Sequence, residues 1–294
     1  MTTATVTPIG AFSLPAAAAF LRGFDPIAHA DDHDGRVVRL PMIVEDTWLP
    51  AAAEIVDRHD GRLDITVCGP GAGDVAIAQV RNVLSIDVDP GPFDAICAAD
   101  PVLADVRQRH RLLRPVLFAS VYESLAWALL SQRTRMTAAA AARARIADAL
   151  GSTVGLGDHR LTVFPEPDRL SQLAPMTGVP EVKAARLRGL AHAAVDDDLT
   201  ATSLRDDPDA IDRLQRLDGV GPFSAELALI RGAGALDRLP RHEHRLAATV
   251  RDRYRVPDAT DDDIAVIAAA WRPYRAWAAF LLRVDATSNT SRPA

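Results

Sequence analysis

Residues 240–245 read Pro-Arg-His-Glu-His-Arg and bring together the side chains best able to do chemistry. Glu243 supplies a carboxylate, a group that is ionised in water at neutral pH and could stabilise a developing positive charge. His242 could accept or donate a proton in the same pH range. Because three consecutive residues at the start of a helix point in different directions, we do not expect His242, Glu243 and His244 to bind a metal.

Residues 217–222, Leu-Asp-Gly-Val-Gly-Pro, predict a tight turn between two helices shortly before this cluster. Gly219 and Gly221 allow backbone angles that a side chain would oppose, and Pro222 suits the first turn of the next helix. The backbone N–H groups around Gly219, Val220 and Gly221 would then face outward at a helix N-terminus, a place suited to a phosphate. The alternative is an ordinary connection between helices with glycine at the C-cap.

The elements that would position these residues fall into two parts. Alternating segments at 36–44 and 62–68, followed by an amphipathic helix at 74–84, predict an α+β domain with an antiparallel sheet over residues 13–89. Residues 90–285 form the predicted helical domain. Residues 1–12 are expected to be a loose leader and 286–294 a disordered tail. Helices are predicted at 92–98, 101–110, 120–132, 136–150, 168–173, 181–195, 208–217, 222–231, 244–254 and 261–282.

The composition limits the function classes. The chain has 294 residues, 48% of them hydrophobic, so it can bury a full core. Two cysteines are too few for a four-cysteine zinc or iron–sulfur site. The net charge of -6 argues against a protein that coats DNA by bulk charge, although local arginines could still contact phosphates. No segment is typical of a signal peptide or a membrane span, and we expect a cytoplasmic location.

Several motifs resemble one family. Residues 217–225 (LDGVGPFSA) resemble the hairpin of the helix-hairpin-helix DNA glycosylase superfamily. Residues 164–170, 178–191 and 271–282 (FPEPDRL, GVPEVKAARLRGLA and WRPYRAWAAFLL) resemble, in this order, motifs of bacterial 3-methyladenine DNA glycosylase II. Residues 122–132 are similar to the family helix that ends in Leu-x-Gln. The N-terminal unit is similar to the TATA-binding-protein-like domain of that subfamily, so the resemblance covers roughly residues 15–285.

The resemblance implies how particular residues would act. Family members bend the duplex, fill the gap with a wedge side chain and flip the damaged nucleotide into a pocket. By resemblance, Arg133 lies in the wedge region, and Phe223, Leu227 and Arg283 surround the pocket. Members that also cleave the strand use a lysine where this chain has Phe223, so a monofunctional enzyme is implied. Hairpin carbonyls could hold a monovalent cation, and no other cofactor is implied.

The catalytic position departs from the family pattern. The family's aspartate lies two residues after a proline, and counted from Pro240 that position is His242, with Glu243 next. A neutral imidazole does not stabilise a sugar cation as a carboxylate does. We therefore predict that a small local shift lets Glu243 serve as the carboxylate and that His242 assists by orienting a water.

The sequence thus predicts an α+β protein with a TATA-binding-protein-like antiparallel sheet domain followed by an all-helical helix-hairpin-helix glycosylase domain. The leading hypothesis is a monofunctional DNA glycosylase that excises alkylated purines of the 3-methyladenine type in base-excision repair. The expected partner is double-stranded damaged DNA, held through its backbone by Gly219, Val220, Gly221 and Phe223; the protein is expected to be a monomer that does not contact membranes. The alternative is a catalytically inactive homologue that binds damaged DNA.

Overall fold

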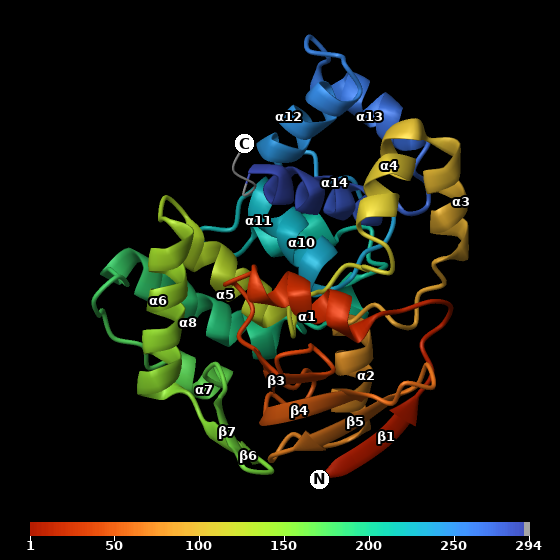
Figure 1. The fold of residues 1–294 in the computed structure, drawn as a ribbon. Coiled ribbons are helices and arrows are strands. Elements are labelled where there is room, and N and C mark those ends of the chain that lie inside the picture. The colour runs from red at the N-terminus through yellow and green to blue at the C-terminus, as the bar shows by residue number, and fades with distance from the viewer. Residues whose placement is uncertain (291–294) are drawn as a thin grey trace.

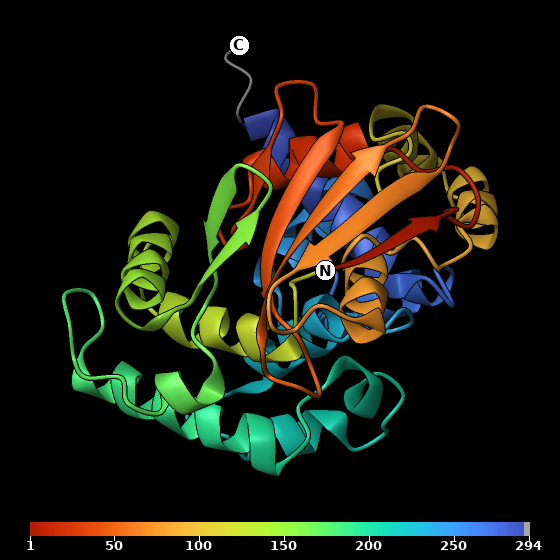
Figure 2. The ribbon, with the colours of Figure 1, turned by 90° about the horizontal axis from the view of Figure 1, so that it is seen from below.

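The N-terminal part carries an antiparallel sheet in the order β1-β5-β4-β3-β2, in a computed structural model that describes residues 1–290 (Figure 1). In β5, Leu63, Ile65 and Val67 are buried and alternate with partly exposed residues, as in a strand with one face on a core. Helices α1 (Leu14–Arg22) and α2 (Asp74–Val83) lie between the sheet and the helical part (Figures 1 and 2). The strands are β1 (Thr2–Val6), β2 (Ala30–Asp31), β3 (Val37–Ile43), β4 (Pro50–Asp57) and β5 (Leu63–Cys68).

The first strand corrects one prediction. A loose leader over residues 1–12 is wrong for its first half, because β1 pairs with β5 and places Val6 opposite Leu63. Thr5 Oγ1 also donates a hydrogen bond to Asp64, at 2.6 Å. The strand lies at the edge of the sheet and only Val6 is buried, so the sequence shows little of the apolar alternation that marks a strand.

The second part is helical, and its helix α5 (Val121–Ser131) is buried at every residue from 121 to 130. Ser120 begins this helix by accepting the backbone N–H of Glu123 at 3.1 Å. The other elements of this part are α3 (Gly91–Ala99), α4 (Pro101–Arg109), α6 (Met136–Leu150), β6 (Thr153–Leu156), β7 (His159–Thr162), α7 (Pro167–Leu170), α8 (Glu181–Asp196), α9 (Ala201–Leu204), α10 (Ala210–Gln215), α11 (Pro222–Leu227), the π-helical turn η1 (Ala228–Gly232), α12 (His244–Arg253), α13 (Asp261–Ala269) and α14 (Arg275–Thr290).

The last predicted helix is in fact two helices. The prediction of one helix over residues 261–282 is wrong because α13 ends at Ala269 and α14 begins at Arg275. Pro273 has no N–H to donate within a helix, and the turn around it buries Trp271 completely.

At the C-terminal end, the predicted tail from residue 286 is helical as far as Thr290, and residues 291–294 lie outside the described part of the chain. In residues 1–290 no helix is long and apolar enough to cross a membrane.

Two buried carboxylates join the sheet to the helical part. Glu123 in α5 accepts a hydrogen bond from Arg143 at 2.8 Å and from the backbone N–H of Ile43, in β3, at 3.3 Å. Glu45, which follows β3, accepts the backbone N–H groups of Val121 at 3.0 Å and Ala201 at 2.8 Å. The starts of α5 and α9 are therefore fixed to the end of the sheet by one side chain.

Burial of Glu45 predicts a dependence of stability on pH. Burial raises the pKa of Glu45 from 4.5 to about 7, and the hydrogen bonds from Ala201 and Val121 oppose this only in part. The folded state therefore keeps a proton that the unfolded chain has lost, so stability is greatest below the unfolded pKa and is lost as pH rises towards 7. Between pH 5 and 7.5 the free energy of unfolding should fall by about 2–3 kcal/mol relative to Glu45→Gln. Urea denaturation at both pH values measures this change, and an equal gap at both would contradict it.

Candidate active site

The hairpin between α10 and α11 has the geometry that its sequence predicts. Val220 donates its N–H to the carbonyl of Leu217 at 3.0 Å. Gly219 has a φ of +82°, and a Cβ there would lie 2.5 Å from Cδ of Arg186. Gly221 is different, because its φ is -90° and a Cβ would meet open space. Gly219 is therefore required by the fold, whereas Gly221 leaves room beside the start of α11.

Three segments meet at the hairpin. Gln132, at the end of α5, donates Nε2–H to the carbonyl of Gly219 at 2.6 Å. Arg186 of α8 donates to Oε1 of the same Gln132 at 3.2 Å. The next residue, Arg133, is exposed with a φ of +51°, so its side chain stands on a sharp turn beside the hairpin. The structure thus brings the predicted wedge region to the predicted backbone-binding site.

A histidine and a buried carboxylate lie next to the hairpin. Glu226 of α11 is three residues after Phe223 and hence on the same side of the helix. Its Oε2 accepts the backbone N–H of His242 at 3.0 Å, and its Oε1 lies 3.0 Å from the ring Nδ1 of His242. The Glu226 side chain is 10% exposed and that of His242 is 52% exposed. The ring therefore faces solvent with its inner nitrogen held by a buried acid.

Glu243 has a different neighbour. Its Oε2 lies 3.0 Å from Nε of Arg283 in α14, and both side chains are partly buried. Glu243 is the N-cap residue of α12, but its side chain does not cap the helix. The two residues were predicted to have separate roles, as carboxylate and pocket wall, whereas the structure joins them in one ion pair. The positive charge of Arg283 offsets the negative charge that Glu243 would offer a substrate.

The two predicted apolar pocket residues differ in exposure. Phe223 is 46% exposed although it is a large aromatic residue. Leu227, one turn further along, is partly buried against the core of the N-terminal part. Phe223 is therefore free to stack on a ligand, and Leu227 lies deeper.

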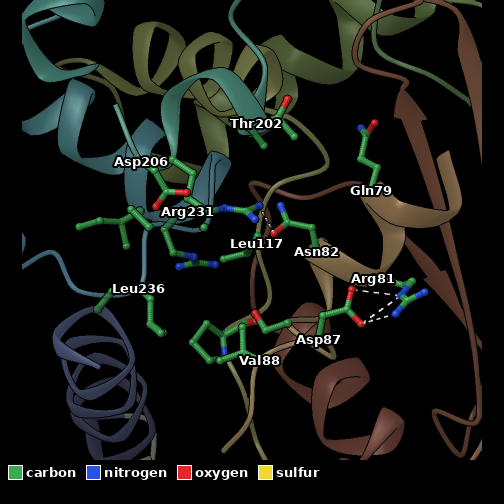
Figure 3. Close-up of a pocket in the computed structure, with 18 of the residues that line it drawn as sticks. Gln79, Arg81, Asn82, Asp87, Val88, Leu117, Thr202, Asp206, Arg231 and Leu236 are labelled. Atoms are coloured by element: carbon green, nitrogen blue, oxygen red, sulfur yellow. Dashed lines mark hydrogen bonds and ion pairs between the residues drawn. The ribbon is translucent and has the colours of Figure 1, made fainter. Parts of the chain in front are cut away.

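A cleft of about 720 Å³ lies elsewhere, between α2, α9, η1 and the first half of α14 (Figure 3). Its walls mix both charges: Arg81 is paired with Asp87, and Arg205 binds Asn82 at 2.6 Å. The residues predicted for catalysis, DNA binding and the base pocket are not among those that line it. The candidate active site, along α11 and the start of α12, thus lies apart from this cleft.

Glu226 is the residue that the sequence analysis missed. Its signal is a single charged residue within an apolar helical run, Ala225, Leu227, Ala228 and Leu229. A carboxylate on the packed face of a helix needs a partner, because burial of an uncompensated charge is costly. Nothing in the spacing identifies His242 as that partner, since 16 residues and two turns separate them.

No family model matches the chain. It is 24% identical over 216 residues to a DNA-3-methyladenine glycosylase of Bacillus subtilis, with 70% of each chain covered. It is 30% identical over 156 residues to DNA-3-methyladenine glycosylase 2 of Escherichia coli, with 51% of this chain and 52% of that protein covered. The chain thus spans about half the length of the second relative.

The fold is similar to that of a solved glycosylase. A solved 3-methyladenine DNA-glycosylase from Archaeoglobus fulgidus superposes with a TM-score of 0.77 at 18% identity, covering 96% of this chain and 97% of that one. At this identity the superposition shows the fold alone, in which the sheet precedes the helical part in the chain. With the hairpin at 217–222 and the ordered motifs around it, the chain is similar in sequence to DNA-3-methyladenine glycosylases and in fold to the solved one.

Proposed function

We propose that this protein is a DNA glycosylase of base-excision repair that releases alkylated purines by hydrolysis of the N-glycosidic bond. The observation that carries the proposal is the arrangement of two neighbouring groups of residues. One runs from the loop of Arg133 through Gln132 to Gly219, and the other from Phe223 along α11 to Glu226 and His242. The residues proposed as wedge, phosphate-binding turn, stacking surface and proton acceptor therefore lie on neighbouring elements.

Each part of this line has a chemical use. The outward N–H groups of Gly219, Val220 and Gly221 suit a phosphate of the duplex. Arg133 would fill the gap left by the flipped nucleotide, and the exposed ring of Phe223 would stack on its base. An alkylated purine already carries positive charge, so it leaves as a neutral base without an added proton. The enzyme then has to stabilise positive charge on the sugar and supply a water.

The residue at the strand-cleavage position supports a monofunctional enzyme. Phe223 has no amine and cannot form a Schiff base with the sugar. The reaction would therefore end with an intact strand that carries an abasic site. Borohydride should trap no covalent complex between the protein and alkylated DNA, and the product strand should break only after alkali treatment.

The decisive experiment measures single-turnover release of 3-methyladenine and 7-methylguanine from alkylated duplex DNA. We expect release with excess wild-type protein at a rate well above that of the duplex alone. Binding of alkylated duplex without release would instead favour a catalytically inactive DNA-binding homologue. That second candidate rests on His242 at the family's aspartate position and on the pairing of Glu243 with Arg283.

A further inference from the structure

The contacts between Glu226 and His242 fix the orientation of the histidine ring. Both oxygens of Glu226 contact one residue: one accepts the backbone N–H of His242 and the other lies 3.0 Å from its Nδ1. Because a carboxylate only accepts hydrogen bonds, Nδ1 carries the proton in this contact. In the neutral ring, Nε2 is then an acceptor on the exposed side of the residue.

The two groups differ in their access to solvent. Glu226 lies on a helix whose neighbouring residues Ser224 and Ala225 are buried, and its own side chain is 10% exposed. It cannot reach a substrate as readily as His242, whose side chain is 52% exposed. Any effect of the buried acid on chemistry at the surface would therefore pass through the histidine ring.

We propose that His242 is the general base that takes a proton from the attacking water, and that Glu226 is the positioning residue that holds its ring. This inference rests on the proposed glycosylase function. In this proposal the carboxylate that supports the reaction is Glu226 and not Glu243. The oxygens of Glu226 hold His242, whereas Glu243 is paired with Arg283. A carboxylate that fixes the tautomer of a histidine and stabilises its protonated form is a recurring device in enzymes.

The step balances as a hydrolysis. The water oxygen forms a bond to C1′ of the deoxyribose as the N-glycosidic bond breaks. The electron pair of that bond goes to the cationic purine, which leaves neutral. The proton of the water goes to Nε2 of His242. The products are an abasic sugar with a hydroxyl at C1′, a free alkylpurine and an imidazolium that is held by Glu226.

The charge of the Glu226–His242 pair explains how a histidine could occupy the position of the family's aspartate. An isolated imidazolium would repel a sugar that is gaining positive charge. A neutral ring with the Glu226 carboxylate carries one negative charge, and after proton transfer the pair is neutral. Two neighbouring charges are themselves paired: Glu243 with Arg283 of α14, and Arg241 with Asp262 of α13 at 3.4 Å.

Four variants of the full-length protein test the proposal: Glu226→Gln, Glu226→Asp, His242→Gln and Glu243→Gln. The probe is single-turnover release of 7-methylguanine from a duplex with one such base, at increasing protein concentration. We expect Glu226→Gln to lower the maximal rate constant by at least about tenfold and His242→Gln by about a hundredfold. The protein concentration for half-maximal rate should change little, because neither side chain is expected to hold the backbone.

Three further results separate positioning from a structural role. The double variant Glu226→Gln/His242→Gln should be no slower than His242→Gln alone, because the acid acts through the ring. Glu226→Asp should recover part of the rate. With ¹⁵N-labelled histidine, the wild-type ring of His242 should show the proton on Nδ1, and Glu226→Gln should shift this tautomer balance. Glu54→Gln, on β4, is the control for differences in preparation and folding between variants.

Each outcome decides the proposal. Wild-type rates in both Glu226→Gln and His242→Gln would overturn it and leave the glycosylase function intact. Loss of release in Glu243→Gln with full release in Glu226→Gln would overturn it in favour of Glu243. Absence of release by the wild type would overturn the proposed function, and this inference with it.

Discussion

Substitution of Gly221 by glutamate is expected to weaken binding of damaged and undamaged duplexes alike by about tenfold or more at low salt. A Cβ at this position meets open space and the φ of -90° suits any residue, so the fold should be kept. The new carboxylate would stand where a phosphate is expected to approach the hairpin N–H groups. Phosphate contacts carry no sequence information, so the loss should be the same for every duplex.

Fluorescence anisotropy with a labelled duplex, over about 50 to 200 mM salt, measures both the affinity and its salt dependence. The slope against salt should be smaller in Gly221→Glu because fewer counterions are released. Gly221→Gln is the matched control, since it adds nearly the same volume without charge and should bind much more like the wild type. An unchanged Kd and slope in Gly221→Glu would show that the hairpin is only structural.

Substitution of Asp285 by asparagine is expected to lower the free energy of unfolding by about 3 kcal/mol at neutral pH. The Asp285 side chain is 2% exposed and holds Arg109 at 2.7 Å, His110 at 3.2 Å and Arg253. Asp285 lies two residues after Arg283, and its contacts join α4 and α12 to α14. Without the carboxylate the positive groups would lose their shared counter-charge inside the helical core.

The pH dependence gives this prediction a second test. Burial raises the pKa of Asp285, but the hydrogen bond and charge of Arg109, with Arg253 and His110, outweigh it and hold the pKa below its ordinary value. A lowered pKa contributes stability above the unfolded value, which is lost as pH falls through the folded value. The gap between wild type and Asp285→Asn in urea denaturation should therefore shrink below about pH 4.

Asp105→Asn is the matched control for this second prediction. Asp105 also pairs with Arg109, at 2.5 Å, but its side chain is 58% exposed. An exposed pair of this kind contributes at most about 1 kcal/mol, so this variant should unfold almost as the wild type does. Equal stability of Asp285→Asn and wild type at neutral pH would contradict the predicted role of the buried carboxylate.

The sequence determined the elements whose cause is local. Gly219 and Pro222 specify the hairpin, because a φ of +82° favours glycine and the first turn of α11 accepts a proline. The helical period and the caps likewise predicted α6 at 136–150, the bounds that the structure shows. Local signals were insufficient for β1, whose strand is defined by pairing with β5 some 60 residues away in the sequence, as in the contact of Thr5 with Asp64.

The candidate active site likewise combines features that the sequence predicts with contacts that only the fold creates. The sequence predicted that His242 and Glu243 follow the hairpin closely, since the order of the motifs is given by the chain itself. It did not show which side chain each of them contacts. Glu226 reaches His242 and Arg283 reaches Glu243 only because α11, α12 and α14 pack at particular angles, which depend on core contacts along their whole lengths. Tertiary structure alone therefore decided that the acid held against the histidine is the buried Glu226.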